Sequence, residues 1–257
     1  MSTSDWLRTD IGTTTADAIT VRGHDLAGEL MGRVTFTELA FLLVQGRMPA
    51  EGETMLLDAV LVSLADHGLT PTVLAARLTY TGAPESLQGA VASGLLGAGT
   101  VFLGVVEDAA VFLAGIVAGS QGDVDMNAAA DAAVAARLES GRRVPGLGHP
   151  IHRVEDPRTP RMYAIAEEAG VLGPHLRALE LVAAAAAKRT GRSLPINGAG
   201  AAGAALADIG FAPEIVRGFA LLARTAGVVA HLAEEMERPL GMPLFRDVDE
   251  RLAEGRR

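Results

Sequence analysis

Apolar residues recur three and four positions apart along almost the whole chain, and alanine fills many of the positions between them. Alanine has the highest intrinsic helix propensity, and this spacing places the apolar side chains on one face of a helix. Runs that alternate apolar and polar residues, as half-buried strands do, are few. The sequence therefore predicts an all-α fold.

Glycine, proline and polar residues divide the chain into helical segments. Thr35 and Glu38 form a capping-box pattern at the start of one helix, and Gly46 followed by Pro49 ends it. A short polar stretch at 121–125 resembles a hinge. Because small side chains let helix axes approach closely, we expect a dense, multilayered core. Further helices are expected over residues 51–66, 71–80, 84–96, 107–118, 127–138, 159–169, 175–188, 200–209 and 212–236.

Composition excludes several classes of protein. The 257 residues are 49% hydrophobic and 21% charged, and none is cysteine. The chain is therefore not of the disordered class, and it has no disulfide, zinc thiolate or cysteine nucleophile. A net charge of −9 without a basic cluster argues against nucleic acid as a partner. We expect no metal site.

The sequence predicts neither a secretory signal nor a membrane span. The first residues lack a basic stretch followed by an apolar run. The most apolar segment, residues 94–119, has Glu107 and Asp108 at its centre, where two carboxylates would be costly in a bilayer. We expect a cytoplasmic protein in which this segment is buried in the core or in a two-fold interface.

One long loop interrupts the helical pattern at residues 141–160, GRRVPGLGHPIHRVEDPRTP. A loop of this length in a compact helical protein is more often functional than not. His149 and His152 can exchange protons near neutral pH, and the loop's arginines carry forked donors suited to phosphate or carboxylate. The loop therefore predicts an anion site. The alternative is a surface loop whose arginines pair with its own acidic residues, Glu155 and Asp156.

Several segments resemble the citrate synthase family and occur in the family's order. Val144–Arg158, VPGLGHPIHRVEDPR, resembles the coenzyme A and active-site loop, with Gly-x-Gly-His and Asp-Pro-Arg at matching spacing. The chain is much shorter than a full citrate synthase, and GLLGAGTVF at 94–102 is closer to citryl-CoA lyases and to the C-terminal lyase domain of ATP-citrate lyase. The other similar segments are ITVRGHDLAGEL (19–30), FTELAFLLVQGRMP (36–49), LADHGLTPTVLAAR (64–77) and FALLARTAGVVAHLAEE (219–235).

The resemblance implies an architecture as well as a fold. It predicts a citrate-synthase-like multihelical fold with a large lobe, residues 1–107 and 208–257, and a smaller lobe, residues 108–207. The smaller lobe carries the loop and would close over the pocket, expelling water. The resemblance also implies a homodimer or higher homo-oligomer, a coenzyme A thioester as substrate and no tightly bound cofactor.

Site residues follow from the resemblance position by position. His149 matches the histidine that binds the oxygen on the carbon where the bond forms or breaks, and His67 matches a second substrate-binding histidine. Arg158 and Arg224 match arginines that hold substrate carboxylates. The loop positions that match coenzyme A contacts are Val144, Pro145, Gly146, Leu147, Gly148 and Arg153.

Arginines near the carboxyl end raise two further expectations. Arg224 lies in the apolar stretch 221–230, where an unpaired guanidinium would be costly, so it needs an anionic partner, either structural or substrate. Arg238 or Arg246 matches a substrate-binding arginine that reaches across the dimer, and both positions remain open. His231, seven residues after Arg224, is interpreted as a satisfied interface histidine.

Two catalytic residues of the citrate synthase family are absent. Phe102 stands where citrate synthases have a histidine, a change that ATP-citrate lyase shares, and it is expected to line the substrate pocket. The family's catalytic aspartate falls on Asn197 in one register and on Ala199 in the other. Asparagine can orient the thioester oxygen or a water molecule, but it cannot move the proton at the α-carbon. The carboxylates that could substitute are Asp66, Glu107, Asp108 and Asp208.

These features predict a carbon-carbon lyase that binds a small acyl-CoA and a polycarboxylate. It would cleave citryl-CoA or a related 3-hydroxyacyl-CoA to acetyl-CoA and a 2-oxo acid, oxaloacetate in the first case, or catalyse the reverse condensation. The missing carboxylate leaves an alternative, a catalytically silent or regulatory homologue that keeps the binding pocket. In a third hypothesis, the apolar residues around Phe102 bind the aliphatic acyl chain of a different substrate.

Overall fold

The computed structural model describes residues 9–120 and 125–254. It is 66% helical with few strands, as the helical periodicity predicts. The α-helices are α1 (Phe36–Gln45), α2 (Glu51–Ala65), α3 (Pro71–Gly82), α4 (Leu87–Leu96), α5 (Gly104–Gly119), α6 (Met126–Glu139), α7 (Arg158–Glu168), α8 (Pro174–Thr190), α9 (Gly198–Asp208), α10 (Val216–Glu237) and α11 (Gly241–Glu254).

Local signals place both ends of α1 correctly. Thr35 and Glu38 form the expected capping box of α1, and Gly46 ends that helix in the left-handed region at φ 73°. The helix expected over 212–236 is divided, because a 3-10 turn, η2 (Pro213–Ile215), precedes α10. Residues 121–124 of the expected hinge lie outside the described residues, and Asp125 caps α6 through the Asn127 N–H.

Two elements were not predicted from the sequence. The first is a small antiparallel sheet of β1 (Gly12–Thr14), β2 (Ile19–Val21) and β3 (His24–Asp25), followed by a π-helical turn, η1 (Leu26–Leu30). The Arg22 guanidinium docks this sheet on the end of α1 by donating to the Leu43 carbonyl at 2.6 and 3.0 Å. The second is α11, which adds a final amphipathic helix.

Helix α9 lies at the centre of the packing. It contacts α5 and α8 extensively, and its residues from Gly200 to Leu206 are all buried. A Cβ atom at Gly203 would overlap the Val106 carbonyl of α5, and a Cβ at Gly200 would lie 2.5 Å from the Cα of Gly146. The small residues therefore allow the close helix packing that the composition predicts.

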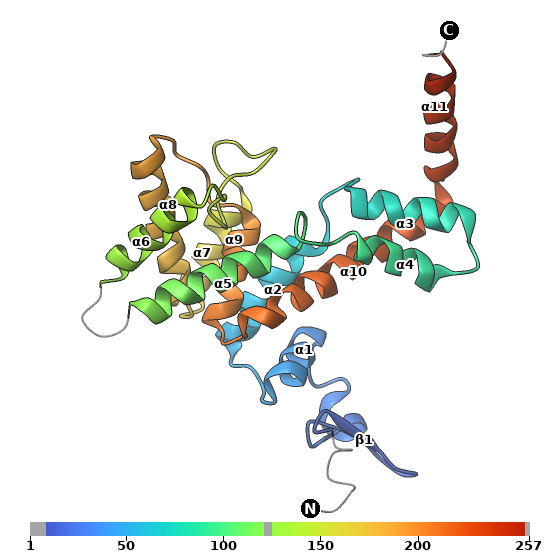
Figure 1. Cartoon of the computed structure of the whole chain (residues 1–257). Helices are drawn as coiled ribbons and strands as arrows, with labels where there is room; N and C mark the ends of the chain where they lie inside the picture. The colour runs from blue at the N-terminus through green and yellow to red at the C-terminus, as the bar shows by residue number, and fades with distance from the viewer. Residues whose placement is uncertain (1–8, 121–124, 255–257) are drawn as a thin grey trace, which may run out of the picture.

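Figure 1 shows how the helices are arranged. Helices α5 to α9 gather at one end, α10 runs beside α2 through the middle, and α3 and α4 lie at the other end. Helix α11 projects beyond α3, and the sheet lies beyond α1. The long loop leaves the α5–α9 group between α6 and α7, so the fold can bring it to the end of α2.

The most apolar segment is only partly buried. Helix α5 turns Val106, Leu113 and Ile116 into the core, as expected, whereas Leu96 and Val101 are 85% and 78% exposed. Among the described residues, one helical stretch is long and apolar enough to cross a membrane, Pro213–Glu237. That stretch packs against α2 and other helices, which is also the behaviour of a core helix.

Candidate active site

The loop between α6 and α7 is held against the chain that leads into α9. The Gly148 N–H donates to the Pro195 carbonyl at 2.8 Å, and the Asn197 N–H donates to the Gly146 carbonyl at 2.9 Å. Gly146 and Gly148 adopt φ values of 81° and 78°, a region that favours glycine. These contacts fix the loop's position next to the start of α9.

The expected coenzyme A contacts divide into two groups. Val144, Pro145 and Gly146 are buried and support the loop from within, while Leu147 and Gly148 are half-buried and Arg153 is exposed. Leu147 pairs with Ile196 in an isolated β-bridge. Contact between the loop and coenzyme A remains a prediction. It would involve the accessible rim of the loop, formed by Leu147, Gly148 and Arg153.

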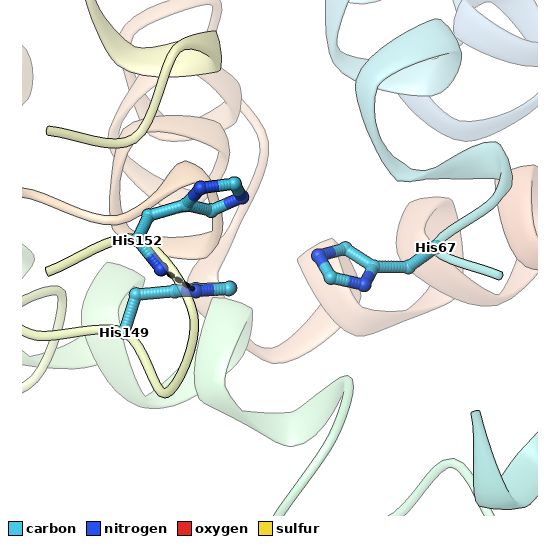
Figure 2. Close-up of side chains that lie close together, drawn as sticks. All are labelled: His67, His149 and His152. Carbon is cyan, nitrogen blue, oxygen red and sulfur yellow. Dashed lines mark hydrogen bonds between the residues drawn. The ribbon is translucent and has the colours of Figure 1, made fainter. Parts of the chain in front are cut away.

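Three histidines converge beside this loop. Figure 2 shows His67, from the connection between α2 and α3, pointing toward His149 and His152. The ring centroids of His149 and His152 are 4.5 Å apart in a stacked arrangement, and those of His67 and His149 are 5.6 Å apart. The sequence predicts His67 and His149 in one pocket, and the structure brings them together.

Local hydrogen bonds define the protonation state of His149. Its Nδ1 accepts from the backbone N–H groups of Ile151 and His152 at 3.2 and 3.0 Å. Burial lowers the pKa of this imidazole, and the nearby Asp156 charge only partly offsets that effect. At pH 7 the ring is therefore neutral and carries its proton on Nε2, which makes Nε2 a hydrogen-bond donor.

Arg158 at the start of α7 is paired within its own loop. Its Nε and Nη2 donate to the Asp156 carboxylate at 3.0 and 2.7 Å. Burial opposes the charge on Asp156, but hydrogen bonds from Arg158 and from the Gly198 N–H outweigh it and hold the pKa of Asp156 far below its usual range. The loop's own acidic residue thus positions this arginine, and Nη1 points to the Ser63 carbonyl at 3.4 Å.

Arg224 on α10 lacks the ion pair that its buried position would predict. Its side chain is 6% exposed, and its Nε and Nη2 donate to the Leu64 carbonyl at 3.3 and 3.1 Å. Burial lowers the pKa of Arg224, and Asp66 opposes the shift from a distance. Within the described residues no carboxylate lies within 4 Å of this guanidinium, so a substrate carboxylate could supply the missing charge.

The carboxyl end of α2 brings the predicted groups together. The adjacent carbonyls of Ser63 and Leu64 accept hydrogen bonds from Arg158 and Arg224 respectively, and His67 follows three residues later. The charge of Arg158 affects the ionisation of both Arg224 and His149. Two arginines and a donor histidine at one point can bind a carboxylate and an adjacent oxygen.

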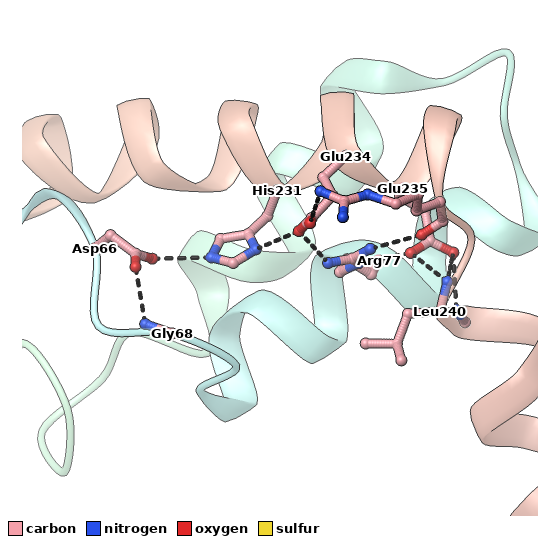
Figure 3. A network of polar contacts seen from close by, with 9 residues as sticks. Asp66, Gly68, Arg77, His231, Glu234, Glu235 and Leu240 are labelled. Atoms are coloured by element: carbon pink, nitrogen blue, oxygen red, sulfur yellow. Dashed lines mark hydrogen bonds and ion pairs between the residues drawn. The ribbon is translucent and has the colours of Figure 1, made fainter.

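A polar network fixes the loop that carries His67. The Asp66 carboxylate accepts from the Gly68 N–H at 2.9 Å and lies 2.9 Å from His231 Nε2 (Figure 3). Burial works against the charge on Asp66, but these hydrogen bonds outweigh it and lower its pKa. Nε2 of His231 thus has a partner within the chain, whereas its buried Nδ1 forms no hydrogen bond and lies 3.9 Å from the Glu234 carboxylate, so the expectation of a satisfied interface histidine holds for one nitrogen only.

Sequence reasoning singled out His231 but missed the rest of this network. The buried Arg77 of α3 pairs with Glu235 at 2.5 Å and with Glu234 at 3.0 Å. The Glu235 carboxylate also accepts from the Leu240 and Gly241 N–H groups, which fixes the junction of α10 and α11 (Figure 3). The one signal for this network in the sequence was an arginine, Arg77, within the apolar face of α3.

Both polar atoms of the Asn197 amide are hydrogen-bonded. Its Oδ1 caps α9 by accepting from the Gly200 N–H, and its Nδ2 donates to the Gly148 carbonyl, both at 2.8 Å. Its neighbour Ala199 contributes no polar side chain. A catalytic contribution from Asn197 remains a prediction, and the structure adds a role in holding the loop.

The four carboxylates named as substitutes for the aspartate are all paired. Glu107 binds Arg217 and Asp108 binds Arg137, at 2.6 and 2.9 Å. Asp208 is buried, where it accepts N–H groups at the start of α8 and contacts His175. Only Asp66 lies beside the converging groups, and its lowered pKa makes it a weak base.

The substrate-binding roles of Phe102, Arg238 and Arg246 remain predictions. Phe102, in the turn before α5, is 40% exposed. Arg238 pairs with Glu234 of its own chain, and Arg246 is exposed on α11. Helix α11 packs mainly on α3, away from the loop, so within one chain Arg246 does not join the histidines (Figure 1).

The fold is that of the citrate synthase family. A model of the citrate synthase C-terminal domain matches residues 50–246, and the chain belongs to this family. The structure of citryl-CoA lyase from Hydrogenobacter thermophilus is 32% identical with a TM-score of 0.82, over 90% of this chain and 87% of that one. A comparison with curated protein sequences finds no match.

Two further structures share the fold at lower identity. ATP citrate lyase from Methanothrix soehngenii, in complex with citrate and coenzyme A, is 22% identical over 90% of this chain and 39% of that one, with a TM-score of 0.76. Citrate synthase from Thermoplasma acidophilum, in complex with carboxymethyl coenzyme A and oxaloacetate, is 20% identical with a TM-score of 0.65. The match covers 79% of this chain and 54% of that one. The chain is a citrate-synthase-like lyase, and the silent homologue is not favoured.

Proposed function

We propose that this protein cleaves citryl-CoA, or a related 3-hydroxyacyl-CoA, to acetyl-CoA and a 2-oxo acid, and that the same site supports the reverse condensation. The observation that carries the proposal is the meeting of Arg158, Arg224 and His67 at the carboxyl end of α2, opposite His149. The similarity to citryl-CoA lyase over nearly the whole chain supports this substrate class.

In this mechanism the two arginines hold carboxylates and His149 acts on the alcohol oxygen. In the bond-forming direction, Nε2–H of His149 donates to the carbonyl oxygen that becomes the alcohol. In cleavage the alcohol proton passes to a water molecule, and the Nε2–H of His149 stabilises the resulting alkoxide by the same hydrogen bond. The carbon-carbon bond then breaks, and its electron pair passes to the thioester enolate. The enolate then takes a proton to give acetyl-CoA.

Protonation of the enolate must proceed without the family's catalytic aspartate. General acid-base catalysis contributes roughly 10²–10⁴-fold in rate, so an enzyme that relies on Asn197 and an ordered water would be slow but active. Replacing Asn197 and Ala199 singly with aspartate tests this point. An Asn197→Asp variant that is faster by a similar factor supports a water route, whereas activity that appears only in an aspartate variant indicates a silent parent.

His149→Ala tests the assigned site, with His24→Ala in the amino-terminal sheet as the matched control. The first variant should lose cleavage of citryl-CoA, measured as release of oxaloacetate, and the second should retain it. Cleavage at the wild-type rate by His149→Ala would overturn the assignment.

The remaining features are part of the same proposal. Coenzyme A would contact Leu147, Gly148 and Arg153 on the accessible rim of the loop, without a tightly bound cofactor. The lobe of residues 108–207 would close over the larger lobe and exclude water. We expect this chemistry in the cytoplasm.

Helix α11 supports a homodimer in this proposal. Its exposed apolar residues recur on one face and would be buried against a second chain. Docking in this way could carry Arg246 to the partner's pocket. The exposed apolar residues of α11 are Met242, Phe245, Val248 and Leu252.

A further inference from the structure

We propose that His67, His149 and His152 form a binding site for one divalent transition-metal ion of the class of Zn²⁺ or Co²⁺. One ring nitrogen from each histidine lies within 4.8 Å of those of the other two. The three side chains come from two segments that are distant in sequence, so the loop contacts described above create the cluster. His152 has no role in the proposed cleavage, and the cluster gives it one.

The donor set decides the class of ion. Three neutral imidazoles are the ligands of three-histidine zinc sites, in which a fourth position stays open to water or substrate. In the described part of the chain no carboxylate joins this cluster at that distance. Magnesium and calcium prefer oxygen ligands, so they should bind poorly here.

The geometry requires a small adjustment of the rings. Tetrahedral zinc with bonds of about 2.0–2.1 Å places two nitrogen ligands roughly 3.3 Å apart. The ring nitrogens of the three histidines would therefore have to move closer together by up to about 1.5 Å. The His149 and His152 rings, which are now stacked, would tilt apart so that one nitrogen of each points at the ion. Ile151, between them, is 67% exposed, so this turn meets little packing resistance.

Ion binding should also reorganise the turn at His149. The Nδ1 atom of His149 now accepts from the Ile151 and His152 N–H groups. A metal bond to this ring, through either nitrogen, is incompatible with both hydrogen bonds, because Nδ1 must bind the metal or carry the proton. The amide signals of Ile151 and His152 should therefore shift when the ion binds.

The consequence for activity rests on the proposed function. An ion on His67 and His149 occupies the position assigned to the substrate oxygen, so the loaded protein should not turn over until a chelator removes the ion. Metal binding itself does not depend on that function and is measured separately.

The experiment uses untagged full-length protein treated with EDTA and dialysed. Titration calorimetry with Zn²⁺ alone should give one ion per chain, and Co²⁺ should give the visible absorption bands of a nitrogen-ligated site. His152→Ala should weaken Zn²⁺ affinity at least about 10-fold, since even outer-shell losses cost 10–100-fold in metal affinity. His24→Ala, which removes a histidine of the amino-terminal sheet, should bind like the wild type.

Each result has one interpretation. Equal Zn²⁺ affinity in wild type and His152→Ala, or no Zn²⁺ binding by folded wild type, would overturn the metal site. Circular dichroism of the variant checks that it is folded. Zn²⁺ binding with unchanged citryl-CoA turnover would contradict the inhibition, while the absence of any turnover in metal-free protein would count against the proposed function and leave the site standing.

Discussion

Gly198 leaves no space for a side chain beneath the Arg158 guanidinium. A Cβ atom at this first residue of α9 would lie 2.5 Å from both Cζ and Nε of Arg158, and 2.8 Å from Nη2. Favourable contacts between carbon atoms are about 3.5–4.0 Å long. In Gly198→Ala the guanidinium must therefore move by about 1 Å. Such a shift pulls Arg158 away from the geometry that Asp156 imposes.

The structure gives an expected size for both effects. Alanine in place of a helical glycine stabilises by roughly 0.5–1 kcal/mol, whereas a weakened hydrogen bond to a charged group costs about 1.5–3 kcal/mol. The free energy of unfolding should thus fall by about 1–2 kcal/mol. A displacement of 1 Å in a positioning group costs about 100-fold, which is the loss expected in kcat/KM for citryl-CoA.

Gly115→Ala in α5 is the matched control, because a Cβ atom there meets nothing within 4 Å. It should raise the free energy of unfolding by roughly 0.5–1 kcal/mol and leave kcat/KM unchanged. Urea denaturation and steady-state kinetics measure both quantities. If Gly198→Ala behaves like Gly115→Ala in both assays, the placement of Arg158 is wrong.

Three further predictions concern the site and the proposed dimer. Asp156→Asn should cost about 3–5 kcal/mol in urea denaturation, because it leaves Arg158 without a buried counter-charge. Since folding lowers the pKa of Asp156, the wild type should hold this advantage above about pH 3.9 and lose it as the pH falls below that value; equal stability of the two proteins at pH 7 would contradict the pairing. Arg224→Lys should raise KM for citryl-CoA, because lysine cannot offer a forked donor, and an unchanged KM would argue against a carboxylate at this position. Phe245→Ser should shift the molar mass in light scattering toward that of one chain, and a wild type that is already monomeric would refute the interface.

Local sequence patterns predicted most of the fold. Helical periodicity located the helices, and the Thr35 capping box and Gly46 gave the bounds of α1. The amino-terminal sheet was missed because strands of two or three residues are too short to show alternation. Helix α11 was missed because its apolar residues lie among many charges.

The candidate site was predictable where its partners are close in sequence. Asp156 lies two residues from Arg158, so their pairing could be anticipated. The cap formed by Asn197 had a signal as well, because asparagine before a helix is a favoured N-cap. The contact of Arg224 with Leu64 spans 160 residues, and no local pattern shows it. For the same reason no local pattern shows that His152 lies near His67.

Single-turnover cleavage of citryl-CoA tests the central claim most directly. With enzyme in excess over substrate, even a slow catalyst completes one turnover, so a modest rate cannot be mistaken for inactivity. The account predicts acetyl-CoA and oxaloacetate in equal amounts from the metal-free wild type. Citryl-CoA that binds to the protein and is recovered intact would contradict it.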